Sequence, residues 1–195
     1  MSILVLDNYD SFTYNLVQYV EEMSGIRPDV FRNDEITVAE AARYDKILLS
    51  PGPGLPSESG ILCDLIRELA PVKSIFGVCL GLQAIGEVFG GSLENLPRVF
   101  HGVATPMHVR KRDELLFREI PETFAAGRYH SWVVSKKGLP DCFDLTCEDD
   151  EGQIMGLTHK KYDVRGVQFH PESVMTEHGK VMVRNWVTSA SAGGE

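Results

Sequence analysis

The stretch that decides the fold reads Ser74-Ile75-Phe76-Gly77-Val78-Cys79-Leu80-Gly81, and a helical pattern continues from residue 82 to residue 89. An apolar run that ends in a glycine-framed cysteine before a helix predicts a buried strand, a sharp turn and a helix. The helix dipole and the free N–H groups at the start of that helix favour a thiolate on the turn. The pattern therefore predicts a reactive thiol at Cys79, with a buried structural cysteine in a tight turn as the alternative.

Strands and helices alternate along the first half of the chain. Short apolar runs are typical of buried parallel strands, and each run is followed by a pattern with helical spacing. The predicted strands lie at 3–6, 29–31 and 46–50, and the predicted helices at 12–25, 37–44 and 61–70. Regular alternation predicts an α/β fold with an open, mostly parallel, doubly wound sheet and helices on both of its faces.

The second half changes character, because short strands and turn signals such as Lys137-Gly138 and Glu151-Gly152 replace the alternation. Strands are predicted at 103–109, 128–135, 143–147, 154–158 and 166–169, followed by a last helix at about 176–189 and a frayed end at 191–195. These strands predict an antiparallel extension of the same sheet. Because the chain contains no linker-like stretch, residues 1–195 are predicted to form a single domain.

Composition and charge exclude several classes of function. A net charge of -9 argues against a nucleic-acid partner, since phosphate binding needs a basic surface. No apolar run reaches the roughly 20 residues of a membrane span, and the N-terminus lacks the basic region of a signal peptide. The four cysteines form no C-x-x-C pair, which favours a reducing cytoplasm and structural roles for Cys63, Cys142 and Cys147.

A histidine and a carboxylate follow the last predicted strand, in Phe169-His170-Pro171-Glu172. Residues two apart on a strand project to the same face, so Glu172 is expected to fix the tautomer of His170 and leave the other ring nitrogen for the thiol. Cysteine, histidine and carboxylate are together the parts of a thiol acyl-transfer site. The alternative is a core histidine satisfied by a nearby carboxylate. Neither H-x-H nor H-E-x-x-H occurs, so no zinc site is predicted.

A loop rich in proline and glycine, Ser50-Pro51-Gly52-Pro53-Gly54-Leu55-Pro56, connects a predicted strand to a predicted helix. It lacks the lysine and spacing of a phosphate-binding P-loop. Proline fixes the backbone while glycine leaves exposed N–H groups, so the loop is suited to present amides to an oxyanion beside Cys79. The alternative is a stiff turn that only connects a strand to a helix.

Three motifs together resemble those of the class I, triad-type glutamine amidotransferases. These are the loop at 50–54, the segment from Gly77 to Gln83, and Phe169-His170-Pro171-Glu172-Ser173, and their order and spacing fit over nearly the whole chain. The N-terminal stretch Leu6-Asp7-Asn8-Tyr9-Asp10-Ser11-Phe12-Thr13-Tyr14-Asn15-Leu16 is similar to that of one branch of the family. That branch comprises the small glutaminase subunits, or component II, of anthranilate synthase and aminodeoxychorismate synthase.

The resemblance implies a flavodoxin-like sheet and a role for each matching residue. Cys79 is the implied nucleophile, His170 the general base and acid, and Glu172 the group that orients the imidazole. The backbone amides of Gly54 and Leu80 are the implied oxyanion donors. The implied glutamine site comprises Gly52, Pro53, Gly54, Leu80, Gln83, Ser131 and Trp132. The family more often has leucine at the position of Trp132, so a backbone contact is expected there rather than a side-chain contact.

The resemblance also implies partners. L-Glutamine is the implied substrate, and a large synthase subunit that binds chorismate is the implied acceptor of ammonia, facing residues 8–14. No cofactor is expected on this chain, and any Mg²⁺ is expected on the partner. Anthranilate formation for tryptophan biosynthesis is the first expectation. The alternatives are the same chemistry for aminodeoxychorismate synthase in folate synthesis, a non-catalytic regulatory subunit of the same fold, and a cysteine peptidase-like hydrolase.

Overall fold

A computed structural model describes residues 1–190 of the chain, so the prediction for 191–195 lies outside the described residues. Within this part, nine strands form one sheet in the order β2-β1-β3-β4-β11-β10-β9-β6-β7. Its first five strands are parallel neighbours. They are β1 (Ile3–Asp7), β2 (Asp29–Arg32), β3 (Lys46–Leu49), β4 (Ser74–Val78) and β11 (Val164–Val167). The predicted α/β fold with a mostly parallel sheet is therefore confirmed.

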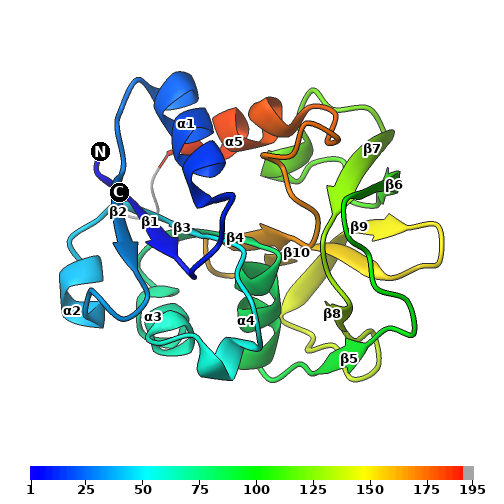
Figure 1. Ribbon diagram of the computed structural model, residues 1–195, viewed down its shortest axis with the longest axis horizontal. Coiled ribbons are helices and arrows are strands. Elements are labelled where there is room, and N and C mark those ends of the chain that lie inside the picture. Colours follow the sequence, from blue (N-terminus) through cyan, green and yellow to red (C-terminus); the bar gives the residue numbers. More distant parts are fainter. Residues whose placement is uncertain (191–195) are drawn as a thin grey trace.

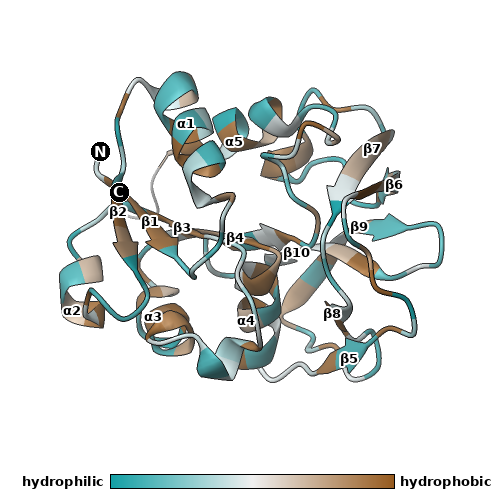
Figure 2. Cartoon of the chain, viewed as in Figure 1, coloured by the Kyte–Doolittle hydropathy of each residue, from teal (hydrophilic) through white to brown (hydrophobic). Residues whose placement is uncertain are grey.

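Helices cover both faces of the parallel half of the sheet (Figure 1). One face carries α1 (Thr13–Ser24) and α5 (Gly179–Val187), and the other carries α2 (Val38–Ala41), α3 (Leu62–Leu69) and α4 (Leu80–Val88). Each face buries its own apolar cluster between sheet and helices, and the central strands are correspondingly hydrophobic (Figure 2). Burial of apolar surface on both faces explains why these strands read as continuous apolar runs.

Residues at the helix ends stabilise the boundaries of α1 and α2. The Thr37 side chain accepts a hydrogen bond from the backbone N–H of Glu40, whose own side chain reaches back to the N–H of Thr37. This reciprocal capping box satisfies two N–H groups that have no partner within the helix. Gly25 ends α1 in the left-handed conformation, with φ of 70°, where a side chain would be strained.

The second half adds the predicted antiparallel extension. Strands β10 (Ile154–His159), β9 (Phe143–Asp149), β6 (Val103–Val109) and β7 (Thr123–Arg128) continue the sheet beyond β11. A separate pair is formed by β5 (Leu93–Asn95) and β8 (Trp132–Val134), and short 3₁₀ turns lie at Pro56–Glu58 and Leu115–Phe117. The predicted single strand at 128–135 is wrong, because β7 ends at Arg128 and β8 begins at Trp132. The intervening residues 129–131 turn toward the carboxyl edge of the parallel strands.

Three further boundaries differ from the predictions. Helix α2, predicted at 37–44, ends at Ala41. Strand β11 ends at Val167, so His170 and Glu172 lie in a turn rather than on a strand. Helix α5 begins at Gly179, later than predicted, because the preceding residues form turns and the Thr176 hydroxyl donates to the carbonyl of His170 at 2.5 Å. Tertiary contacts of the His170 turn therefore outweigh helical spacing in this segment.

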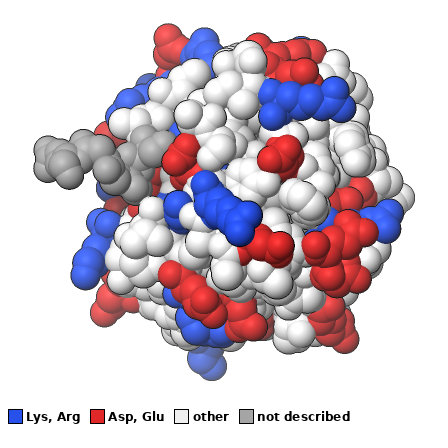
Figure 3. Space-filling view, turned by 90° about the vertical axis from the view of Figure 1, so that its left-hand side faces the viewer, with Lys and Arg blue, Asp and Glu red and all other residues white. Residues whose placement is uncertain are grey.

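Two features of the described chain are the distribution of its surface charge and the character of its helices. On the face shown in Figure 3, acidic and basic side chains are intermixed, as on a solvated protein surface. Within residues 1–190, no helix has both the length and the apolar character needed to cross a membrane.

Candidate active site

Cys79 occupies the turn between β4 and α4, as the sequence predicts. Its φ is 54° and its ψ is -102°, a conformation that non-glycine residues rarely adopt. Such a backbone costs on the order of 1–3 kcal/mol and persists only where the surrounding structure enforces it. Because Leu80 is the first residue of α4, the sulfur lies at the N-terminal end of a helix, where a negative charge is favoured.

The two glycines around Cys79 are required by close packing. A Cβ at Gly77 would lie 2.6 Å from the backbone carbon of Gly81, and a Cβ at Gly81 would lie 2.8 Å from the carbonyl oxygen of Leu49 on β3. Both distances are shorter than real Cβ contacts. The glycine frame therefore lets α4 approach β3 and β4 closely enough to fix the strained turn at Cys79.

His170 and Glu172 form a buried pair. Nδ1 of His170 lies 2.6 Å from Oε1 of Glu172, and both residues are 2% exposed. A carboxylate accepts only, so Nδ1 is the protonated ring nitrogen that donates to it. Nε2 of His170 and Oε2 of Glu172 have no hydrogen-bond partner within the described residues. One ring nitrogen is therefore available for chemistry. The arrangement is the predicted one, although a turn rather than a strand brings the two side chains together.

Neighbouring rings and backbone groups hold the imidazole in place. The ring centroid of Tyr129 lies 4.8 Å from that of His170, and Phe12 packs edge-on at 6.3 Å. The N–H of His170 donates to the carbonyl of Gly127 at 3.0 Å. Burial by itself lowers the pKa of His170, but Cys79 and Glu172 outweigh this effect and raise the pKa to about 11. The raised pKa suits His170 to take up a proton and hold it as the imidazolium.

Two adjoining cavities meet at Cys79. The smaller, of about 200 Å³, is bordered by six residues of the predicted site, namely Gly52, Pro53, Gly54, Gln83, Ser131 and Trp132, and by Tyr129 and His130. The second, of about 370 Å³, contains His170 and is bordered by residues 9–12. Cys79 contributes to both. Two predicted residues, Leu80 and Glu172, border neither cavity, since their side chains are buried. Leu80 can therefore act only through its backbone N–H, and Glu172 only through His170.

The loop at 50–54 is fixed against the end of β1. The Asn8 N–H donates to the Ser50 hydroxyl at 2.8 Å, and the Asn8 side-chain amide donates to the Ser50 carbonyl at 2.8 Å. Asn33 donates to the Asn8 side-chain oxygen at 3.0 Å. These buried hydrogen bonds hold the following glycines at the rim of both cavities. The loop is therefore a rigid wall of the site.

The structure also brings to the site residues that the sequence analysis missed. Gln168 is fully buried and its Nε2 lies 3.4 Å from the Cys79 sulfur. His130 borders the smaller cavity and contacts Arg128, which forms a buried ion pair with Asp149 at 2.8 Å. The signal for Gln168 was present, because it lies two residues before His170 at the end of a predicted strand. The pairing of Arg128 with Asp149 depends on sheet register, and no local pattern reveals it.

The other three cysteines differ from Cys79. Cys63, Cys142 and Cys147 are not disulfide-bonded, and burial raises the pKa of each thiol. Cys147 is fully buried as expected, whereas Cys63 is half-buried on α3. A raised pKa leaves little thiolate, so these thiols are poor nucleophiles.

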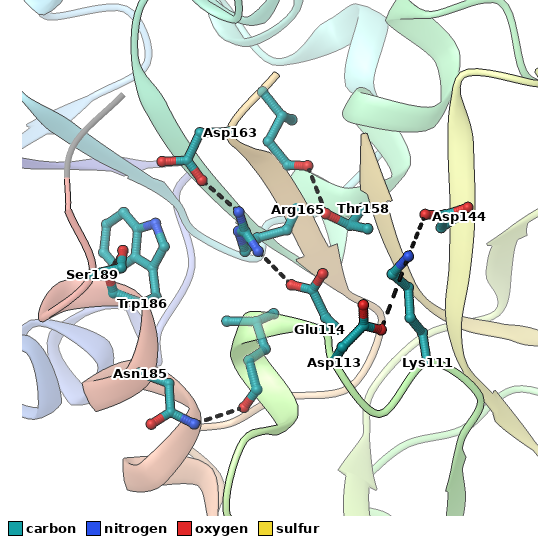
Figure 4. Close-up of polar contacts among 12 residues, drawn as sticks. Lys111, Asp113, Glu114, Asp144, Thr158, Asp163, Arg165, Asn185, Trp186 and Ser189 are labelled. Atoms are coloured by element: carbon teal, nitrogen blue, oxygen red, sulfur yellow. Dashed lines mark hydrogen bonds and ion pairs between the residues drawn. The ribbon is translucent and has the colours of Figure 1, made fainter. Parts of the chain in front are cut away.

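A larger cavity, of about 640 Å³, lies at the opposite end of β11. Several of its charged side chains pair with one another (Figure 4). Arg165 donates to Glu114 and to Asp163, each at 2.5 Å, and Lys111 donates to Asp144 at 2.8 Å. It contains no cysteine. Within the described part of the chain, no group of three or more His, Cys, Asp or Glu side chains is placed to hold a metal ion.

Comparisons with known proteins identify the family of this chain. The model of the glutamine amidotransferase class-I family matches residues 4–190. Anthranilate synthase beta subunit 2, chloroplastic, of Oryza sativa subsp. japonica is 48% identical over 95% of this chain and 70% of its own length. Aminodeoxychorismate/anthranilate synthase component 2 of Bacillus subtilis (strain 168) is 44% identical over 95% of each chain.

A solved structure gives the same result for the fold. The crystal structure of a Thermoplasma acidophilum protein, provisionally described as one of the subunits of GMP synthase, superposes with a TM-score of 0.85 at 27% identity. The match covers 96% of this chain and 92% of the other. The chain belongs to the class I glutamine amidotransferase family.

Proposed function

We propose that this chain is a glutaminase subunit that hydrolyses L-glutamine through a thioester on Cys79 and delivers ammonia to a synthase subunit. One observation carries the proposal. The His170–Glu172 pair leaves Nε2 of His170 unpartnered in the cavity that also contains the strained Cys79. A nucleophile, an oriented base and a rigid loop with glycine amides are the components of acyl transfer.

The first half-reaction forms the thioester. His170 takes the proton of Cys79, which the raised pKa of His170 favours, and the sulfur reacts as the thiolate. The sulfur attacks the side-chain amide carbon of glutamine, and the resulting oxyanion is stabilised by the amides of Gly54 and Leu80. Each such donor is worth about 3 kcal/mol in related acyl-transfer sites. Protonated His170 then donates to the leaving nitrogen, which departs as ammonia.

The second half-reaction returns the free enzyme. Neutral His170 takes a proton from water, and the hydroxide attacks the thioester carbon. The C–S bond breaks, its electron pair returns to the sulfur, and glutamate leaves. Glu172 keeps Nδ1 of the ring oriented in both half-reactions. The thiolate and the imidazolium are then both restored.

The smaller cavity is the glutamine site. Gly52, Pro53 and Gly54 form one wall, and Gln83, Ser131 and Trp132 form another. The Trp132 carbonyl already accepts hydrogen bonds from Gln83 at 2.9 Å and from His130 at 3.0 Å. A backbone contact at this position therefore persists whatever side chain is present, which accounts for tryptophan where the family more often has leucine.

The second cavity is the exit for ammonia. It extends from Cys79 to Tyr9, Asp10, Ser11 and Phe12, the segment expected to face the synthase. Exposed aromatic side chains near it, with Tyr9 at 49% and Tyr14 at 66%, suit a protein partner. Chorismate binds on that partner, and any Mg²⁺ belongs there. The cavity shields ammonia from protonation, which would destroy its nucleophilicity.

Anthranilate formation in tryptophan biosynthesis is the favoured pathway. The curated relative from rice is named for anthranilate synthase, whereas the relative from Bacillus subtilis is named for both anthranilate and aminodeoxychorismate synthesis. The second candidate is therefore the same glutaminase chemistry for aminodeoxychorismate synthase. A cytoplasmic location is proposed from the free cysteines of the described chain.

Co-purification of the chain with its synthase tests the proposal. With glutamine and chorismate, the complex is expected to form an aminated product, identified by mass spectrometry as anthranilate or aminodeoxychorismate. Cys79→Ser is expected to abolish glutamine-dependent product while product from added ammonium salt remains. Loss of both activities in an intact complex would contradict the assignment. Full glutamine-dependent activity of Cys79→Ser would show that this chain has only a regulatory role.

A further inference from the structure

Strand register places Gln168 beside the nucleophile. Strands β11 and β4 are parallel neighbours with Val167 opposite Val78, and the N–H of Cys79 donates to the carbonyl of Val167 at 2.8 Å. The residues that follow these two strands are Gln168 and Cys79, which therefore meet just beyond the carboxyl ends of the strands. Gln168 is fully buried, and its carboxamide nitrogen lies 3.4 Å from the sulfur.

The orientation of the Gln168 carboxamide follows from its partners. A backbone carbonyl only accepts, so the end of Gln83 that lies 2.9 Å from the Trp132 carbonyl is its NH₂ group. The same NH₂ group lies 3.3 Å from Gln168, which must therefore present its oxygen to Gln83. The remaining end of Gln168, its NH₂ group, faces the sulfur of Cys79.

A second chain of contacts ends at the same carbonyl. Nε of Arg128 only donates and lies 3.1 Å from Nε2 of His130, so Nδ1 of His130 carries the ring hydrogen and donates to the Trp132 carbonyl. Burial, assisted by Arg128, lowers the pKa of His130 to about 3, which keeps the ring neutral. The Trp132 carbonyl is thus fixed as an acceptor from two sides, and the orientation of Gln83 is fixed with it.

We propose that Gln168 is a further catalytic residue, which donates an N–H to the Cys79 thiolate. Donated hydrogen bonds stabilise a thiolate, and a carboxamide gives this stabilisation without transferring a proton. In the reaction, which rests on the proposed glutaminase function, the contact acts again when the thioester is hydrolysed. Water adds to the acyl carbon, the C–S bond breaks, and the electron pair returns to a sulfur that already faces the Gln168 donor.

The titration of Cys79 is a readout of this contact. Titratable side chains also surround the sulfur, and they are Tyr9, Asp10, His101, Tyr129, His130, His170 and Glu172. Gln168→Met leaves all of them in place, because methionine has nearly the length of glutamine and carries no charge. A change in the pH dependence of Cys79 reactivity in this variant therefore reports the lost donor.

The test compares Gln168→Met with a matched surface variant, Gln18→Met, in the full chain. Gln18 is exposed on α1, and its side-chain amide donates a hydrogen bond to Glu22 at 2.8 Å. Alkylation of Cys79 by iodoacetamide is followed against pH by peptide mass. Gln168→Met is expected to raise the pH midpoint of alkylation by about one unit, the size expected of one hydrogen bond to a charged group. Gln18→Met is expected to match the parent chain.

Steady-state kinetics give a second readout. Gln168→Met is expected to lower kcat for glutamine hydrolysis by about tenfold while KM stays within about twofold, because the contact acts on the sulfur and not on bound glutamine. An unchanged pH midpoint in a variant with the circular dichroism spectrum of the parent would overturn the proposal. If Gln168→Met does not fold, Gln168→Asn withdraws the same donor by one methylene. The same shift is expected for it, and its absence overturns the proposal equally.

The two readouts separate this proposal from the proposed function. Alkylation by iodoacetamide requires no glutamine. A shifted midpoint in a chain without glutaminase activity would refute the proposed function and leave the Gln168 contact standing. An active chain whose alkylation midpoint is the same in the parent and in Gln168→Met would refute the role of Gln168 alone.

Discussion

The cavities at the two ends of β11, one large cavity at the start of the strand and two smaller ones near its end, differ in how their polar groups are hydrogen-bonded. In the larger one, Lys111, Lys160 and Arg165 pair with carboxylates, as Arg165 does with Glu114 and Asp163 (Figure 4). In the two smaller cavities at Cys79, Nε2 of His170 has no hydrogen-bond partner among residues 1–190, and neither has Oε2 of Glu172, which lies behind the His170 ring. Nε of Arg165 is also unpartnered, but its guanidinium already makes two ion pairs.

The difference shows why cavity size is a poor guide to function. Paired charges cancel one another and leave little to act on a ligand, and a partly exposed pair such as Lys111 with Asp144 contributes about 0–1 kcal/mol. A strained nucleophile and an unpartnered imidazole nitrogen are costly to keep in a folded chain, and they are retained where chemistry requires them. Substitutions in the two regions are therefore expected to have opposite consequences.

The largest effect is expected for removal of the nucleophile. Cys79→Ala is expected to lower kcat for glutamine hydrolysis by a factor on the order of 10⁴ or more, because no thioester can form. Released glutamate, measured by a coupled assay, provides the readout. The matched variant Cys63→Ala removes a half-buried thiol on α3 and is expected to keep activity within about twofold. A comparable loss in both variants would contradict the assignment of Cys79.

Loss of the carboxylate that orients the imidazole is expected to be milder. Glu172→Gln is expected to lower kcat by roughly 10²–10⁴, since it disturbs orientation but keeps the nucleophile. Glu172 helps to raise the pKa of His170, so its loss lowers that pKa. The ring then loses its proton at lower pH, and the alkaline limb of the plot of kcat against pH shifts to lower pH by about one pH unit or more. An alkaline limb that shifts to higher pH, or does not shift, would refute this role.

Ion pairs in the two regions are expected to contribute differently to the free energy of unfolding. Arg128 and Asp149 are 2% and 3% exposed, so Asp149→Ala leaves a buried charge unpaired and is expected to lower the free energy of unfolding by about 3–5 kcal/mol. Asp144, which pairs with Lys111 in the larger cavity, is about one-third exposed. Asp144→Ala is expected to cost about 0–1 kcal/mol. Urea denaturation measures both, and equal losses would contradict the contrast between the two cavities.

The smallest effect is expected in the larger cavity. Lys111→Met removes a cation that already pairs with Asp144, so kcat and KM for glutamine are expected to stay within about twofold of the parent values. The same glutamate-release assay measures both constants. A tenfold loss of activity would show that the larger cavity takes part in the reaction.

Much of the fold was predictable because its signals are local. Apolar runs marked β1, β3 and β4, and the glycine frame marked the strained turn at Cys79. The pairing of His170 with Glu172 was also predicted, although for a partly wrong reason, because the two residues lie in a turn and not on a strand.

The remaining features depend on contacts between distant segments. The break between β7 and β8 places residues 129–131 at the site, and strand register places Gln168 beside Cys79. The ion pair between Arg128 and Asp149 joins two strands of the antiparallel extension. The spacing of Gln168 from His170 places it near the site, but no spacing within the sequence reveals its contacts with Cys79 and Gln83, so tertiary structure was needed to find the buried hydrogen-bond chain behind the glutamine pocket.

Covalent labelling tests most directly whether Cys79, His170 and Glu172 act together at one glutamine pocket. A glutamine analogue with an electrophilic side chain is incubated with the full chain, and the modified peptide is identified by mass spectrometry. Modification confined to Cys79, slowed by excess glutamine and strongly reduced in His170→Ala, is the predicted result. Modification of Cys63 in preference to Cys79, or labelling of Cys79 that glutamine does not slow, would contradict it.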